Sequence, residues 1–221
     1  MNVLTDSRPR PAEHCGSVYN LKVRSDLSER ARQPASNRVH PAGRHRITLY
    51  IGEVAASQSP VVLDTLLGSC VAVCMYDPVL RTGGMNHILL PRCLKGDKSP
   101  RCGVHAMELL INEVMKLGGD RRRFVAKAFG GGNVLPGIKM LQIGDENADF
   151  VRAFLATERI PLVAERLGGN HAVHLYFQTD TGKATVHSVN GSALPKILKA
   201  ESSCFMPPAA NGQFGGEITL F

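Results

Sequence analysis

Apolar residues in the middle of the chain recur at strand spacing. Residues 47–57 and 60–69 are rich in Val, Ile and Leu, and a Ser, Gln and Pro turn separates them, so they predict two strands. Two further apolar runs, 70–77 and 83–91, end at Asp77-Pro78 and at Pro91. Prolines and the intervening glycines mark turns, so this pair predicts a hairpin.

Two later segments carry apolar residues at helical spacing. In residues 104–119 one stripe gathers six side chains, and Gly118-Gly119 provides an end signal. The stripe consists of Val104, Met107, Leu110, Ile111, Val114 and Met115. A second amphipathic helix follows Asp145, which we expect to be its N-cap. Its apolar face consists of Phe150, Val151, Phe154 and Leu155.

Residues 124–129, 161–168, 171–179 and 183–189 predict four more strands, the last two joined by a turn at 180–182. This order predicts a single α+β domain of layered mixed β-sheets, with two main helices packed on one side. We assign residues 46–200 to this domain. Residues 1–45, with four prolines and no sustained apolar period, predict a flexible basic extension, and residues 201–221 predict a loose tail.

Composition narrows the class of protein. The chain has 221 residues, of which 43% are hydrophobic and 20% charged, as in globular proteins. No apolar run approaches the roughly 18 residues that span a bilayer, and no secretory signal opens the chain. We therefore expect a cytoplasmic protein without membrane insertion. The net charge is +7, of which +4 lies in residues 1–45, and only 5% of residues are aromatic with no Trp, which disfavours nucleic acid as a partner.

The six cysteines are expected to be reduced thiols, because the predicted compartment is reducing. Cys93, Cys102 and His105 resemble fragments of a zinc site, although the spacing of a paired CxxC site is missing. We keep metal binding through these three residues as a weaker alternative and expect no metal or other cofactor.

Cys70 and His87 are the candidates for chemistry. Cys70 follows the small-residue turn Gly68-Ser69 at the start of the predicted hairpin. If the hairpin turns over residues 77–80, paired residue numbers sum to 157, and Cys70 lies opposite His87 on one face. A one-residue slip would separate them. A cysteine beside a histidine is the minimal activated nucleophile for attack on a carbonyl carbon.

Other cysteines and histidines have simpler interpretations. Cys74, four residues further along the same strand, is expected to be a small core residue. We expect His105 on a helix surface. No Cys or carboxylate pattern accompanies His171, His174 and His187 on the late strands, so these are expected to be structural or surface residues.

Several linked motifs resemble those of the chemoreceptor glutamine deamidase family, CheD. The segment TLLGSCVAVCMYDP followed by GGMNHILLP is similar to the family's T-x(3-4)-G-S-C-V-A/G-V and G-G-M/L-x-H-x-x-L-P motifs. The resemblance continues through AKAFGGGNVL, IGDENADFVRAFL and GGNHAVHLYFQTDTGKATV, so as a whole it covers about residues 46–190. In this context the triple glycine at 130–132 is interpreted as a structural turn and not as a phosphate loop.

The resemblance implies a cysteine hydrolase that converts glutamine side chains of methyl-accepting chemotaxis receptors to glutamate and releases ammonia, without a cofactor. It implies Cys70 as the nucleophile and His87 as the proton carrier. Thr65 matches the family's threonine with a one-residue gap, since some members carry it where this chain has Asp64. Gly68 and the turn residue Ser69 are oxyanion or substrate-loop candidates, through the peptide N–H groups of Ser69 and Cys70.

The sequence departs from the family pattern at two places. His171 to His174 lacks the usual glycine and basic pair, and Glu146 stands where a basic residue commonly precedes Asn147. These departures bear on the choice of partner or substrate. The alternative function is a non-catalytic signalling regulator that binds a CheC-type phosphatase or receptors.

Overall fold

The computed structural model describes residues 22–23, 44–89, 101–134 and 143–189. The predicted tail at 201–221, most of the extension at 1–45, and Cys93 therefore lie outside the described residues. Within residues 1–45, Lys22–Val23 forms a short strand, β1, which pairs in parallel with Glu53 and Val54.

The described strands form two sheets. One has the strand order β1-β3-β6-β5-β7-β8 and the other the order β10-β9-β4-β2. The strands after β1 are β2 (His45–Thr48), β3 (Glu53–Ser57), β4 (Val61–Leu67), β5 (Val71–Asp77), β6 (Thr82–Asn86), β7 (Val125–Gly130), β8 (Leu162–Leu167), β9 (Val173–Gln178) and β10 (Ala184–Ser188). The helices are α2 (Arg101–Lys116) and α3 (Ile143–Thr157), and a 3₁₀ turn, η1, spans Arg121–Arg123. This arrangement confirms the expected α+β class with layered mixed sheets.

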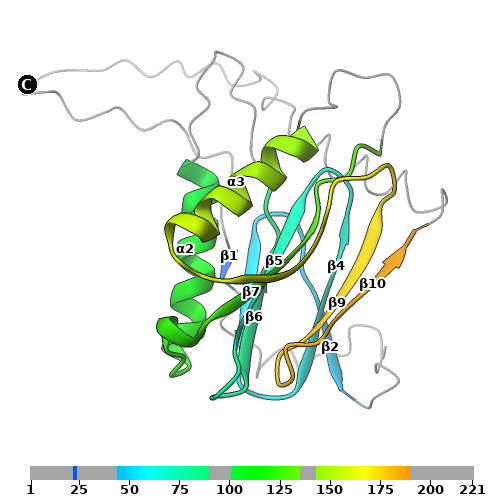
Figure 1. Cartoon of the computed structure of the whole chain (residues 1–221). Helices are drawn as coiled ribbons and strands as arrows, with labels where there is room; N and C mark the ends of the chain where they lie inside the picture. The colour runs from blue at the N-terminus through cyan, green and yellow to red at the C-terminus, as the bar shows by residue number, and fades with distance from the viewer. Residues whose placement is uncertain (1–21, 24–43, 90–100, 135–142, 190–221) are drawn as a thin grey trace, which may run out of the picture.

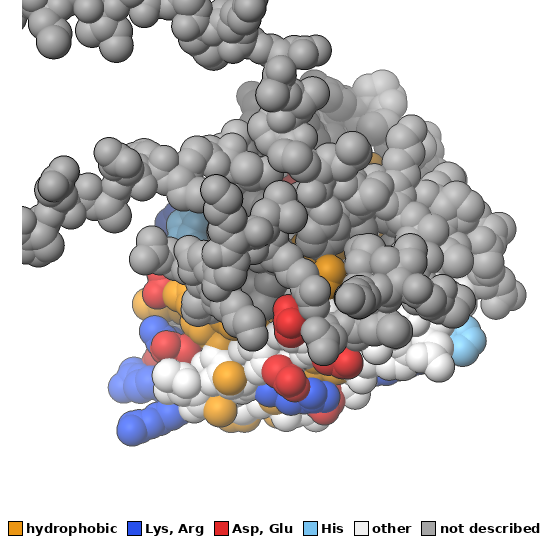
Figure 2. Space-filling view, turned by 90° about the horizontal axis from the view of Figure 1, so that it is seen from above, with side chains coloured by type: hydrophobic (Ala, Val, Ile, Leu, Met, Phe, Trp, Pro, Cys, Tyr) orange, Lys and Arg blue, Asp and Glu red, His pale blue; other side chains and the backbone are white. Residues whose placement is uncertain are grey.

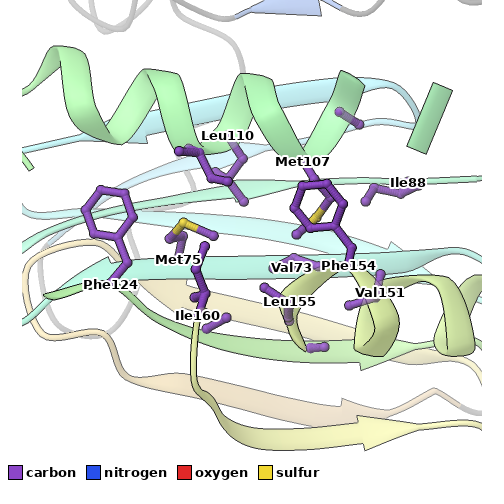
Figure 3. Packing of buried hydrophobic residues seen from close by; sticks show 14 of the residues in the cluster. Val73, Met75, Ile88, Met107, Leu110, Phe124, Val151, Phe154, Leu155 and Ile160 are labelled. Atoms are coloured by element: carbon purple, nitrogen blue, oxygen red, sulfur yellow. The ribbon is translucent and has the colours of Figure 1, made fainter. Parts of the chain in front are cut away.

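The helices cover one face of the six-stranded sheet, and the four-stranded sheet lies against its other face (Figure 1). Strand β5 contributes to both cores because neighbouring side chains in a strand point to opposite faces. Val71, Val73 and Met75 pack toward the helices. Ala72 and Cys74 pack toward the four-stranded sheet. Figure 3 shows the helix-side core, in which Met107 and Leu110 of α2 lie over β5.

The predicted strand at 47–57 is wrong in its extent. It is divided into β2 and β3, which belong to different sheets. Gly52 lies between them with a φ of 80°, a conformation that glycine adopts without steric cost. Strand β2 pairs in parallel with β4, while β3 runs antiparallel to β6.

The expected hairpin of β5 and β6 forms, but its register differs from the prediction. Asp77 pairs with Thr82, so the turn occupies residues 78–81 and paired numbers sum to 159 instead of 157. Arg81 takes a positive φ of 55° in this turn. A shift of two residues keeps every side chain on its predicted face, because the side-chain period of a strand is two.

Both predicted helices form, with corrections at their ends. Met115 belongs to the predicted apolar stripe of α2 but is 43% exposed. Gly118, with a φ of 91°, ends the helix and donates its N–H to the Met115 carbonyl. Helix α3 begins at Ile143, so Asp145 lies in its first turn and is not its N-cap.

The visible described surface in Figure 2 carries Lys and Arg side chains close to Asp and Glu side chains. Ion pairs on the helix-bearing side of the domain include Arg152 with Glu165 and Arg121 with Glu158. The described residues thus pair much of their charge locally.

Candidate functional site

The turn of residues 68–70 joins β4 of one sheet to β5 of the other. Its three carbonyl groups each accept a hydrogen bond from a distant segment. Gly132 N–H donates to the Gly68 carbonyl and Gly131 N–H to the Cys70 carbonyl, both at 2.7 Å. The side-chain amide of Asn147, in α3, donates to the Ser69 carbonyl at 2.8 Å. The backbone that carries Cys70 is therefore fixed from outside the turn.

The glycine loop at 130–132 makes this contact possible. A Cβ atom at Gly130 would lie 2.2 Å from the Cys70 carbonyl oxygen, and Gly130 has a φ of 105°. A Cβ at Gly144 in α3 would lie 2.4 Å from the Gly131 carbonyl oxygen. Real Cβ atoms do not approach backbone this closely, so glycine is required. The expected structural turn is confirmed, and it supports the strand start that carries Cys70.

His87 follows β6 and points between the two sheets, where it meets Thr65 of β4. The Nδ1 atom of His87 lies 2.8 Å from the Thr65 hydroxyl oxygen. The same hydroxyl lies 2.8 Å from the carbonyl oxygen of Leu49. Thr65 and His87 are both buried. The structure therefore brings together two of the three residues that the resemblance implies.

The partners of the Thr65 hydroxyl determine the tautomer of His87. A carbonyl oxygen only accepts, so the single hydroxyl hydrogen of Thr65 is donated to Leu49. The Thr65 oxygen then accepts from Nδ1–H of His87, which leaves a lone pair on Nε2. Among the residues that the structure describes, buried Nε2 has no hydrogen-bond partner.

Burial sets the charge of this histidine. The pKa of His87 falls from its ordinary value of 6.5 to about 4, because burial penalises the imidazolium; the Leu49 carbonyl offsets this only in part. At neutral pH the ring is therefore neutral. A neutral imidazole with a lone pair aimed away from its anchor can accept a proton.

Cys70 lies on the same face as His87. The bridge between Val71 and Ile88 continues the hairpin register, so Cys70 lies across from Leu89, and His87 lies across from Ala72. Cys70 and His87 are consequently diagonal neighbours, for which Cβ atoms are typically about 7–8 Å apart or slightly less. Directly opposite pairing, as predicted, is wrong, but the shared face is correct. Cys70 is buried at 1% exposure.

Other cysteines and histidines for which the sequence gave an expectation are also among the described residues. Cys74 is a buried core residue as expected, and burial raises the pKa of its thiol. His105 lies exposed on α2, as expected. Cys102 lies in the first turn of α2. Among the described residues, no group of three or more His, Cys, Asp or Glu side chains is placed to hold a metal ion.

His174, expected to be a structural or surface residue, contacts a carboxylate that no sequence pattern indicates. His174 Nε2 donates to Asp64 at 2.7 Å, across 110 residues of sequence. Asp64 also accepts two hydrogen bonds from the Arg46 guanidinium, which lower the pKa of its carboxyl despite burial. This cluster lies on the opposite face of β4 from Thr65, because neighbouring strand residues alternate. Asp64 therefore cannot take the place of Thr65 beside His87.

Sequence reasoning gave no role to Asn147. It lies 78 residues from Ser69, and a single asparagine near a helix start has no distinctive pattern. Helical spacing gives a usable signal, since Asn147 shares a buried face with Ile143, Val151 and Leu155. A buried polar side chain on an apolar face requires a partner.

Comparisons with known proteins bear on this geometry. Residues 89–188 match the family described as CheD chemotactic sensory transduction. A probable chemoreceptor glutamine deamidase CheD from Burkholderia mallei (strain SAVP1) is 46% identical over 165 residues, which span 72% of this chain and 70% of the relative. The chain belongs to the CheD family. A probable chemoreceptor glutamine deamidase CheD 1 from Burkholderia thailandensis is 44% identical over 176 residues, covering 76% of this chain and 75% of that protein.

Among solved structures, the Bacillus licheniformis hypothetical protein YfiH aligns with a TM-score of 0.35 at 18% identity. This alignment covers 51% of the present chain and 49% of the YfiH chain. Neither described helix of this CheD protein has the length and apolar character needed to cross a membrane.

Proposed function

We propose that this CheD protein is a protein-glutamine deamidase that hydrolyses specific glutamine side chains of methyl-accepting chemotaxis receptors to glutamate and releases ammonia. The names of its relatives support this reaction. The single observation that carries it is the hydrogen-bond chain from His87 through Thr65 to the Leu49 carbonyl, which leaves the buried Nε2 of His87 as a base.

The first half of the reaction forms a thioester. His87 Nε2 accepts the proton of the Cys70 thiol, and the sulfur attacks the side-chain carbonyl carbon of glutamine. The resulting oxyanion collapses, the carbon–nitrogen bond breaks, and the imidazolium returns its proton to the departing nitrogen, which leaves as ammonia. Burial disfavours the imidazolium in the resting protein, so this charge exists mainly while the oxyanion balances it.

The second half releases glutamate. A water molecule enters in place of ammonia, and His87 Nε2 removes one of its protons as the oxygen attacks the thioester carbon. The carbon–sulfur bond breaks, and the Cys70 thiolate recovers the proton. Thr65 is the positioning residue in both halves, because its hydroxyl holds the Nδ1–H tautomer. No cofactor takes part in these steps.

Gly68 and Ser69 serve the oxyanion. The peptide N–H groups of Ser69 and Cys70 are the proposed donors to the negative oxygen of both tetrahedral intermediates. Small residues in this turn allow the substrate amide to approach the backbone closely.

The partners follow from the reaction. The protein substrate is the cytoplasmic part of a chemotaxis receptor, and the enzyme acts in the cytoplasm. The alternative function, a regulator that binds receptors or a CheC-type phosphatase without catalysis, requires none of the His87 geometry.

Intact-mass spectrometry of a receptor cytoplasmic fragment tests the proposal. Replacement of NH₂ by OH adds about one dalton at each modified glutamine, and the mechanism requires a nucleophile at Cys70. We expect this gain with the wild-type protein and with Cys74→Ala, a matched variant of the neighbouring buried thiol, and none with Cys70→Ala. Binding without any mass gain would favour the regulator.

A further inference from the structure

The turn of residues 68–70 has three successive carbonyl groups, and a side chain donates a hydrogen bond to the middle one. Backbone N–H groups of the glycine loop hold the carbonyls of Gly68 and Cys70. The middle carbonyl, that of Ser69, accepts the 2.8 Å hydrogen bond from the Asn147 amide. This side chain therefore controls the peptide group between Ser69 and Cys70.

The orientation of that peptide determines where the Cys70 N–H points. In a planar trans peptide the C=O and N–H bonds lie in the same plane and point in opposite directions. Fixing the Ser69 oxygen toward α3 consequently aims the Cys70 N–H away from α3. An oxyanion donor is effective only when it is aimed in advance at the developing charge.

We propose that Asn147 is a positioning residue that aims the Cys70 peptide N–H at the oxyanion of the tetrahedral intermediates. The inference rests on the proposed deamidase reaction. Asn147 does not touch the substrate; it acts through the Ser69–Cys70 peptide.

The N-terminal part of α3 packs tightly around the Asn147 amide. Asn147 is fully buried at 0% exposure. Gly144, one turn earlier, packs against the Gly131 carbonyl so closely that no Cβ atom fits there. Helix α3 and the glycine loop thus hold the turn as one backbone-packed unit. An amide buried on an otherwise apolar helix face is costly unless its hydrogen bond is used.

Two reactions of Cys70 separate oxyanion positioning from general damage to the site. Deamidation passes through a tetrahedral oxyanion. Alkylation by iodoacetamide displaces iodide at a saturated carbon and forms no oxyanion, although it requires the same thiol and the same access. If the Cys70 N–H no longer points at the oxyanion, deamidation slows and alkylation by iodoacetamide does not.

The experiment uses Asn147→Ala and Asn147→Leu in the full chain, so that the test still works if one of these two variants fails to fold. Thr179→Val is the matched control. Thr179 is also fully buried and donates its hydroxyl to the Ser59 carbonyl at 2.8 Å, far from the turn. For each protein we would measure the thermal midpoint, kcat and KM for receptor deamidation, and the alkylation rate at Cys70 by peptide mass spectrometry.

We expect kcat to fall about 10- to 100-fold in the Asn147 variants, with KM and the Cys70 alkylation rate within about threefold of wild type. The Thr179→Val control should keep wild-type kcat. Unchanged kcat, or kcat and alkylation falling together, would overturn the role of Asn147. A wild-type protein that is alkylated at Cys70 but deamidates no receptor would instead refute the proposed function.

Discussion

Replacing Thr65 by Val removes one hydroxyl and nearly preserves the shape of a fully buried side chain. The hydroxyl accepts from Nδ1–H of His87 and donates to the Leu49 carbonyl, both at 2.8 Å. Its loss deprives both groups of that partner in a buried setting. We expect the free energy of unfolding to fall by about 1–3 kcal/mol, the usual cost of unpaired buried polar groups.

The effect on activity follows from the tautomer. A neutral hydrogen bond contributes about 0.5–1.5 kcal/mol, which is the preference that Thr65 gives to the Nδ1–H form of His87. Since about 1.4 kcal/mol corresponds to a tenfold change in rate, kcat/KM should fall by up to about tenfold in Thr65→Val. Ammonia release with a receptor fragment measures this, and urea unfolding measures the stability.

Thr65→Ser is the matched control, because it keeps the hydroxyl and removes only a methyl group. It should retain kcat/KM within about threefold of wild type while losing about 1 kcal/mol of stability. Wild-type kcat/KM in a folded Thr65→Val protein would show that the hydroxyl does not orient His87.

Three further predictions concern pH, the hairpin and the glycine loop. Burial keeps the folded pKa of His87 near 4, below 6.5, so its contribution to stability is present above pH 6.5 and is lost as the pH falls toward 4. Unfolding measurements at several pH values should show the free energy of unfolding of the wild type falling by about 3 kcal/mol in this window, a fall that His87→Gln lacks. The kcat/KM of the wild type should decline only near pH 4. A decline centred at pH 6.5 would contradict the burial argument. Asp77→Ala removes a fully buried carboxylate that is paired with partly exposed Arg123 at 2.7 Å. In urea unfolding, the free energy of unfolding should fall by about 2–4 kcal/mol, while kcat of the folded fraction stays at the wild-type value. A fall below about 0.5 kcal/mol would refute this. Gly130→Ala should abolish activity, because its Cβ would meet the Cys70 carbonyl at 2.2 Å. At Gly168 a Cβ has open space, so Gly168→Ala should keep its activity and lose only about 1–2 kcal/mol of stability for its φ of 82°. Equal activity in the two variants would disprove the close approach.

The sequence predicts most of the layered fold because its strands and helices have clear periodicity. The paired sheets follow from apolar runs, and α2 follows from its stripe and its glycine end. The sequence does not separate β3 from β2, since the connection at 49–52 contains only one glycine, Gly52, and leaves the apolar run nearly continuous. The hairpin register was two residues off, because the length of the turn after Asp77 is not readable from residue types alone.

The sequence likewise predicts some residues of the candidate site and not others. Cys70 and His87 lie in one hairpin, so local strand geometry places them on one face even with the wrong register. Thr65 could be assigned only through the family motif, and its contact with His87 depends on how the two sheets pack. The contacts of Asn147 with Ser69, and of His174 with Asp64, join segments 78 and 110 residues apart. Such pairs depend on tertiary packing, which periodicity does not encode.

The central claim is that Cys70 forms a thioester with the substrate glutamine. The direct measurement is acid quenching of the enzyme during turnover with a receptor peptide, followed by intact-mass and peptide-mass spectrometry. We predict an adduct on Cys70 equal to the peptide mass less one ammonia, about 17 Da, present in Cys74→Ala and absent in Cys70→Ala. Conversion of the peptide by Cys70→Ala, or turnover in which no adduct ever forms on Cys70, would contradict the mechanism.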